Sequence, residues 1–239
     1  MDALNRIKFL EDRLHRLSEI GMALSTEKNT DRLFEMILEE AKAITRADGQ
    51  TLYSMNKDGN LEFEIMRNDT MNINMGGTSG IEIPYYPVKL WIDKQTPNEK
   101  NVSAYVALAQ KTVNIHDAYE EEGFDFEGTK NFDEKSGYRS KSFLTVPLKN
   151  HESEIIGVMQ LINARNDHDE VISFNEEMQE QLESLASQGA VALTNKRLVE
   201  ELKTLFEAFI KLIATAIDKK SEYTGGHCNR VQVITMMLA

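Results

Sequence analysis

Cysteine, proline and basic residues are scarce in this chain of 239 residues. A single cysteine cannot form a disulfide within the chain, which is typical of a protein from a reducing compartment. Lysine and arginine number 27 against 39 acidic residues, which gives a formal net charge of −12. Nucleic acids and anionic membrane surfaces both attract cationic side chains. We therefore expect neither a nucleic-acid partner nor a membrane partner.

Long apolar runs are missing as well. No stretch of the sequence approaches the roughly 20 apolar residues that span a bilayer. The opening MDALNRIKFLEDRL lacks the continuous apolar stretch of a signal peptide. The hydrophobic fraction of 41% is ordinary for a globular protein. We therefore expect a soluble, cytoplasmic protein with one large domain, or a medium domain with helical extensions.

Common catalytic and phosphate-binding signatures are also missing. The sequence contains no GxxxxGK[ST], GxGxxG, HExxH, GxSxG or CxxC pattern. His116 and His151 lie in different segments without paired ligand spacing. The acidic cluster at 117–122 lacks the ligand alternation of a calcium loop and is interpreted as a solvated face. We expect no catalytic residue and no resident cofactor in this chain.

Two series of apolar residues repeat at alternating steps of three and four, the spacing of a coiled-coil seam. They predict a parallel homodimer through the helices Ile7–Leu24 and Leu198–Leu212. The alternative is that both seams pack against the domain's own sheet, and we favour it for Leu182–Leu193. The first seam consists of Ile7, Leu10, Leu14, Leu17 and Leu24, with Gly21 in the same frame between the last two, and the second of Leu198, Leu202, Leu205, Phe209 and Leu212.

Between the seams the sequence is rich in strand patterns. Residues 49–68 predict a hairpin around the turn Lys57–Asn60, because Leu61, Phe63 and Ile65 alternate with polar residues. Residues 68–100 predict a long loop, and His116–Ser140 an irregular lid. The other predicted elements are helices at Thr30–Ile44, with Asn29 or Thr30 as N-cap, at Val102–Gln110 and from Phe174 onward, and strands at Ile81–Ile83, Thr112–Ile115, Ser142–Leu148 and Glu154–Asn163.

The stretch NIHDAYEEEGFDFEGTKNFDEKSGYRSKSFLTVPL is the most specific part of the sequence. It resembles the GAF domains of cyclic-nucleotide phosphodiesterases and related bacterial sensors, whose pattern is close to NIPDAYxDxxF…D…TGYRTxxxLxxPL. Residues 155–164 and 173–198 resemble the next strand and the closing helix of that family. The matches within the quoted stretch are Asn114, Ile115, Asp117, Ala118, Tyr119, Phe124, Asp133, Gly137, Tyr138, Arg139, Leu144, Pro147 and Leu148.

The resemblance implies an α+β GAF fold. Its central antiparallel sheet would carry helices on one face and lid helices and loops on the other, flanked by long N- and C-terminal helices. We expect a coiled-coil-like helix at 1–27, a GAF sensor domain at 28–197 and a signalling helix at 198–219. Residues 220–239 would begin a further domain.

A small-molecule ligand is the next implication. Tyr119, Phe124, Phe126 and Phe132 can offer a planar base a stacking face, although we favour a supporting role in the lid for Phe124 and Tyr138. The N-terminus of the helix at 102–110 can offer backbone N–H groups to a phosphate. In cyclic-nucleotide GAF domains these segments line the ligand, which implies contacts at Ser103, Ala104, Tyr119, Asp133, Ser136, Ser140 and Gln160.

Several residues depart from the family pattern and leave the ligand open. Gln160 stands where cyclic-nucleotide pockets often have Glu, and Ala164 stands where the motif has Lys. GAF domains also bind haem, tetrapyrroles or small aromatic acids, or nothing. The lack of a cysteine in the domain argues against a covalently attached bilin. A cyclic nucleotide is the ligand that we expect first, and an unliganded dimerisation spacer is the alternative.

The last segment, FIKLIATAIDKKSEYTGGHCNRV, resembles the opening of the HD-GYP phosphohydrolases. The resemblance implies that His227 is one ligand of a pair of divalent metal ions, Fe or Mn, that hydrolyse cyclic di-GMP in the full-length protein. One histidine cannot hold a catalytic metal, and the partner ligands would lie beyond Ala239. We therefore expect a sensor that is not itself an enzyme and that controls a cyclic di-GMP phosphodiesterase domain. Enzymatic alternatives, a metallohydrolase or a reductase, would need a second ligand cluster or a reactive cysteine.

Overall fold

The fold is taken from a computed structural model that describes residues 18–93 and 95–220, without the side chains of 217–220. The chain divides into two compact units, residues 1–194 and 195–239. The first unit contains the sheet and all the helices that cover it. The second contains the C-terminal part of α5, which as a whole runs from Glu176 to Lys220.

A six-stranded antiparallel sheet forms the centre of the first unit, in the order β3-β2-β1-β6-β5-β4. The two central strands β1 and β6 pair from Gly49↔Ile162 to Ser54↔Gly157. The predicted hairpin is confirmed as β1 and β2, and its turn contains Gly59 at φ 73°. The strands of this sheet are β1 (Gly49–Met55), β2 (Leu61–Asn68), β3 (Ile73–Gly76), β4 (Val113–Ile115), β5 (Phe143–Lys149) and β6 (Ile155–Ile162). A separate two-stranded sheet consists of β7 (Ala164–Arg165) and β8 (Val171–Ile172).

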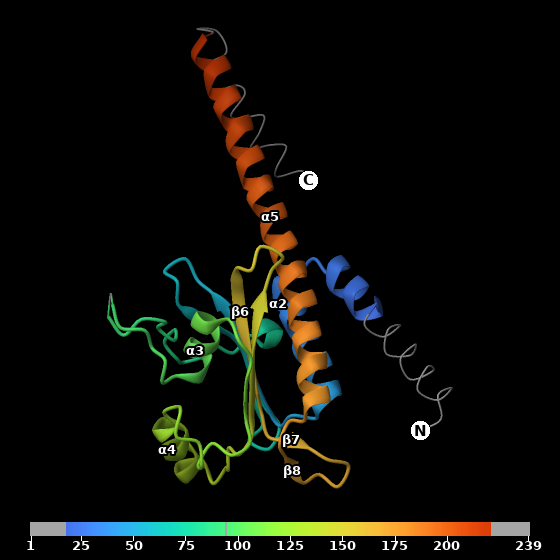
Figure 1. The fold of residues 1–239 in the computed structure, drawn as a ribbon. Coiled ribbons are helices and arrows are strands. Elements are labelled where there is room, and N and C mark those ends of the chain that lie inside the picture. Colours follow the sequence, from blue (N-terminus) through green and yellow to red (C-terminus); the bar gives the residue numbers. More distant parts are fainter. Residues whose placement is uncertain (1–17, 94, 221–239) are drawn as a thin grey trace. The chain divides into compact units, whose positions relative to one another are not determined.

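Helices α2 (Thr30–Thr45) and α5 cover one face of the sheet (Figure 1). Asn29 is the N-cap of α2, because its side chain accepts a hydrogen bond from the N–H of Arg32. Within the first unit, α5 contributes only small and aliphatic side chains to this core. The prediction that Leu182–Leu193 pack against the domain's own sheet is thus confirmed. The core residues of this face include Leu33, Ile37, Leu52, Ile65, Leu144, Met159, Leu161, Leu182, Leu185 and Leu193.

The first predicted seam ends inside this same core. Residues 18–26 are helical, and Leu24 is 2% exposed among the side chains that α2 and α5 contribute. Leu24 therefore packs within its own domain. The remaining seam positions, from Ile7 to Leu17, lie outside the described residues.

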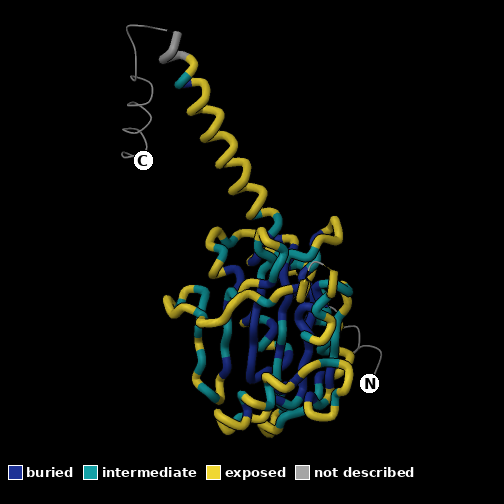
Figure 2. Tube along the Cα trace, turned by 90° about the vertical axis from the view of Figure 1, so that its left-hand side faces the viewer, coloured by how far each residue is buried: buried dark blue, intermediate teal, exposed yellow. Residues whose placement is uncertain are grey.

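The opposite face of the sheet carries α3 (Val102–Ala109) and α4 (Glu127–Ser136) (Figure 1). Tyr53, Phe143 and Val158 point to this face and form a second core with α3 and the lid. Figure 2 shows that buried positions concentrate along the strands between the two layers. The fold is the predicted α+β arrangement, with packing helices on one face and lid elements on the other.

Three local predictions were wrong. Residues 68–100 are not a loop throughout, because they contain β3 and the short 3-10 helix Gly77–Ser79. Residues 81–83 are not a strand, because Gly77 and Gly80 turn the chain at positive φ and Pro84 then removes a ladder donor. The lid is not wholly irregular, because it contains the ten-residue α4. Its sequence EGTKNFDEKS has little apolar periodicity. The buried residue of this helix is instead Asp133, and the helix ends at Gly137, which adopts φ 72°.

Candidate functional site

Asp133 is the centre of the candidate site. It is the buried residue of α4, and its carboxylate accepts three hydrogen bonds from the lid. Tyr119 donates its hydroxyl at 3.1 Å, and Ser140 donates its backbone N–H at 2.7 Å and its hydroxyl at 2.8 Å. A buried carboxylate without such donors would be strongly unfavourable. The structure thus brings together three of the seven residues predicted for the ligand.

Two cationic side chains lie close to the ring of Tyr119. The guanidinium carbon of Arg139 is 3.3 Å from the ring centroid, and Lys130 Nζ is 5.1 Å from it. Arg139 also donates to Asp117 at 2.8 Å. Burial alone would raise the pKa of Asp117, but hydrogen bonds from the Tyr119 N–H and from Arg139 lower its pKa overall. Burial and the Asp133 carboxylate raise the pKa of the Tyr119 phenol.

Gln160 lies on β6 and faces the lid, because its neighbours Met159 and Leu161 point into the helix-covered core. Its amide Nε2 donates to Thr145 Oγ1 at 3.2 Å. The register places Thr51, Gln160 and Thr145 directly across from one another on β1, β6 and β5. A row of polar side chains therefore crosses the lid-facing side of the adjacent strands β1, β6 and β5.

Ser103 and Ala104 are both buried in the first turn of α3. Ser103 hydrogen-bonds Tyr53, whose phenol has a pKa raised to about 12 by burial. The N–H of Ala104 already donates to Asn101 Oδ1 at 3.0 Å. This backbone donor, which we expected to face a phosphate, is therefore occupied by the helix's own N-cap.

Ser136 is exposed and closes the end of α4. Its hydroxyl donates to the Phe132 carbonyl at 2.8 Å and accepts from the Tyr138 N–H at 3.3 Å. It belongs to the helix that carries Asp133 but does not bond to that carboxylate in the structure.

Some aromatic residues of the lid pack in the core, and another belongs to the candidate site. Phe126 is 5% exposed and its ring centroid lies 5.1 Å from that of Phe143. Phe124 makes an edge contact with Tyr105 at 5.3 Å, in agreement with the supporting role that we favoured. The stacking role that we also considered for Phe126 does not fit its burial in the core. Tyr119, which is 36% exposed, is the lid aromatic that bonds directly to the site.

Tyr138 anchors the end of the lid to the sheet. Its hydroxyl donates to Asp48 at 2.6 Å and accepts from Asn163 Nδ2 at 2.9 Å. Asp48 is buried and also pairs with Arg165 at 2.8 Å. Burial and the nearby carboxylate of Asp48 raise the pKa of the Tyr138 phenol.

Sequence reasoning missed several residues of this arrangement. Arg139 and Asn163 were recognised as motif positions, but no role followed from that. The supporting role that we favoured for Tyr138 agrees with its hydrogen bonds to Asp48 and Asn163. The polar positions Thr51 and Thr145 inside predicted buried strands were a usable signal, because strand alternation aims them at one face. Asp48 gave no signal, because it contacts Tyr138 from 90 residues away.

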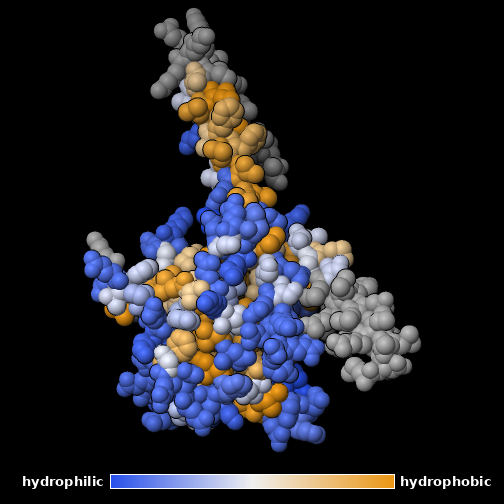
Figure 3. Space-filling model, viewed as in Figure 1, coloured by the Kyte–Doolittle hydropathy of each residue, from blue (hydrophilic) through white to orange (hydrophobic). Residues whose placement is uncertain are grey.

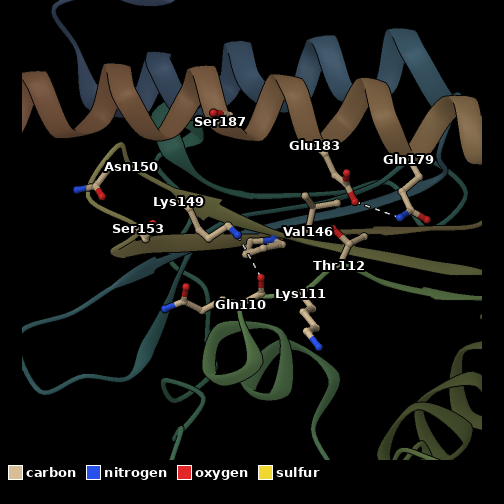
Figure 4. Close-up of a pocket in the computed structure, with 11 residues that line it drawn as sticks. Gln110, Lys111, Thr112, Val146, Lys149, Asn150, Ser153, Gln179, Glu183 and Ser187 are labelled. Atoms are coloured by element: carbon tan, nitrogen blue, oxygen red, sulfur yellow. Dashed lines mark hydrogen bonds between the residues drawn. The ribbon is translucent and has the colours of Figure 1, made fainter.

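Two hollows lie away from the residues predicted for the ligand. One has a volume of about 480 Å³ and is bounded by the end of α3, β5 and α5; Lys149 Nζ donates across it to the Gln110 carbonyl at 3.2 Å (Figure 4). The other has about 640 Å³ and is lined by Asp48 and Arg165 among others. None of the seven residues predicted for the ligand lines either hollow.

Within 18–93 and 95–220, no three His, Cys, Asp or Glu side chains are grouped so that they could hold a metal ion. His227, the expected metal ligand, lies outside the described residues. Among the helices of the described part of the chain, none is long and apolar enough to cross a membrane.

Known structures share this architecture. The GAF domains of phosphoenolpyruvate-protein phosphotransferases from Coxiella burnetii and Acinetobacter superpose with TM-scores of 0.56 and 0.55. Each match covers 79% of this chain and 96% of the other, at 15% identity. Identity this low shows the fold alone, which is that of the GAF domains.

The sequence pattern of the GAF domain family matches residues 29–193, and the chain belongs to this family of regulatory modules. A dual 3′,5′-cyclic-AMP and -GMP phosphodiesterase 11A from Takifugu rubripes is 32% identical over 130 residues. That match covers 54% of this chain but 14% of the relative. The similarity to phosphodiesterases is therefore a similarity between their GAF regions and this one.

Proposed function

We propose that this chain is a sensing module that binds a cyclic nucleotide beneath its lid and controls an HD-GYP-type output domain. The observation that carries the proposal is the Tyr119–Asp133–Ser140 cluster with cations on the Tyr119 ring. A cyclic nucleotide combines a planar base, a hydrogen-bonding base edge and one negative charge. An aromatic ring, a buried polar row and guanidinium and ammonium groups are the matching chemistry.

Each part of the ligand has a proposed contact. The base would stack on Tyr119, while the amide of Gln160 would bond its edge, because Thr145 holds that amide on the lid-facing side of the sheet. The anionic phosphate would lie near Arg139 and Lys130. The lid would then close over the ligand, and α5 would carry the change toward the output domain by population shift.

One observation favours an unliganded spacer as a second candidate. Both oxygens of Asp133 already accept hydrogen bonds from Tyr119 and Ser140. A lid that satisfies its own buried carboxylate is stable without a ligand. A ligand must therefore form interactions that outweigh the hydrogen bond that Asp133 loses if Tyr119 moves away.

Calorimetry and thermal shift with cyclic AMP, cyclic GMP and cyclic di-GMP separate the two candidates. A ligand at 100 times its dissociation constant stabilises the folded state by about 2.7 kcal/mol. Gln160→Ala should weaken binding about tenfold, while Gln95→Ala, in an exposed loop, should leave it unchanged. A chain that none of the three nucleotides stabilises at millimolar concentration would be a spacer.

The output domain is part of the same proposal. The resemblance of the last segment to HD-GYP phosphohydrolases supports a cytoplasmic phosphodiesterase whose metal pair, Fe or Mn, includes His227 as a ligand. In the full-length protein, His227→Ala should abolish hydrolysis of cyclic di-GMP and leave nucleotide binding by the GAF domain unchanged. Hydrolysis at the normal rate would contradict the assignment.

A further inference from the structure

The second unit exposes a continuous apolar face along α5 (Figure 3). Nine large apolar side chains within sixteen residues are between 38% and 68% exposed. Patches of this kind on a folded chain usually mark a surface that another molecule covers. The residues are Leu198, Val199, Leu202, Leu205, Phe206, Phe209, Ile210, Leu212 and Ile213.

These residues fall into regular columns on the helix. With Leu198 at heptad position d, the a and d column continues through Leu202, Leu205, Phe209 and Leu212. Val199, Phe206 and Ile213 repeat at intervals of seven and form an adjoining e column. We call these eight residues the α5 seam. The seam is wider than the a and d columns alone, which increases the apolar area that one partner helix can cover.

The other side of the same helix segment is charged. Glu200, Lys203, Glu207 and Lys211 occupy the outer heptad positions and are exposed. No charged residue interrupts the α5 seam. Two copies of the seam can therefore meet without like charges facing each other, and the charged side remains in water.

The exposed area is large enough for a stable dimer. The eight side chains of the α5 seam offer about 1,000 Å² per chain at these exposures, so that a pair would bury up to about 2,000 Å². A standard protein interface buries about 1,200–2,000 Å² in total.

Asn195 sits at the a position one step before Leu198 and is exposed. A single asparagine at an a position is a known device for fixing register, because its amide finds a partner only opposite the same residue of the second helix. From Leu198 to Leu212 the a and d columns contain no polar residue. We propose that a second copy of this chain covers the α5 seam, parallel and in register, with Asn195 facing Asn195.

The proposal is tested first by mass. Light scattering after gel filtration should give the mass of two chains at micromolar concentration. Leu205→Glu should raise the dissociation constant at least ~100-fold, because it places two carboxylates in the centre of the seam. Lys203→Glu, two residues away on the charged side, should leave the dimer unchanged. A monomeric parent chain, or equal effects of both variants, would overturn the proposal.

Cross-linking tests register without relying on a disruptive variant. In a chain with Cys228→Ser, oxidation of Leu205→Cys should give a disulfide-linked dimer, because equivalent d positions meet in a parallel pair. Lys203→Cys should not cross-link. A dimeric mass without cross-linking at 205 would overturn the parallel, in-register arrangement. Neither test depends on a bound nucleotide, so failure here and failure of the proposed sensing function are distinguishable.

Discussion

At the scale of single residues, the hydroxyl of Tyr138 joins the lid to the sheet. We predict that Tyr138→Phe lowers the free energy of unfolding by about 1–3 kcal/mol, because Asp48 and Asn163 each lose a partner in a buried place. Tyr86→Phe, at a side chain 94% exposed, should change it by less than about 0.5 kcal/mol. Urea denaturation of both variants measures the difference. Equal midpoints would show that the hydroxyl does not anchor the lid.

The residues of the candidate site show how much the sequence predicts at this scale. Tyr119, Asp133 and Ser140 were expected near one another, and the structure joins them by hydrogen bonds. Their spacing in a recognisable motif carried that information. Asp48 precedes the sheet in a stretch without a motif, and it reaches Tyr138 only after the chain folds. Long-range polar pairs of this kind leave no periodic trace in a sequence.

At the scale of elements, strand β2 holds the carboxyl group of Glu64 where burial disfavours its charged form. Burial raises the pKa of Glu64, and the neighbouring carboxylates of Glu62 and Asp31 add to the effect although the Ser54 hydroxyl opposes it. The folded state then binds the proton more tightly than the unfolded state, so the charged side chain lowers stability above its folded pKa. That penalty disappears as the pH falls below the ordinary value of 4.5.

We therefore predict that Glu64→Gln raises the melting temperature at pH 7 and that the gain vanishes near pH 4, where the native carboxyl is protonated in both states. The amide still accepts from Ser54 and removes the charge. Glu62→Gln, on an exposed neighbour in the same strand, is the control and should have a much smaller effect. A gain that persists unchanged at pH 4 would mean that charge is not its cause.

Elements also differ in how well the sequence predicts them. The strands β5 and β6 and the helix α2 were found because apolar periodicity and an N-cap define them locally. The helix α4 was missed because its sequence has little apolar periodicity: its buried residue is Asp133, and its end is marked by Gly137. The segment 81–83 was wrongly assigned because its short apolar run gave no sign of the turns that Gly77 and Gly80 make just before it.

At the scale of the whole molecule, α5 serves both units with different residues. Its last large side chain in the core of the first unit is Leu193, and from Leu198 to Ile213 its large apolar side chains are exposed. From the sequence we predicted that this helix packs against the sheet first and contacts a second chain further on. The exposure of each side chain shows where the contacts with the sheet end. This point coincides with the boundary between the two units after Thr194.

We predict that a chain ending at Thr194 keeps its fold, because the cut removes no large side chain from the two cores of the sheet. Its melting temperature should be independent of protein concentration. The full chain should melt at higher temperature as its concentration rises, because association through the α5 seam stabilises the folded state by mass action. Scanning calorimetry over a hundredfold range of concentration makes the comparison. A shortened chain that is unfolded at room temperature would show that α5 beyond Thr194 supports the sheet. A full chain whose melting temperature does not change with concentration would contradict the proposal that a second copy covers the α5 seam.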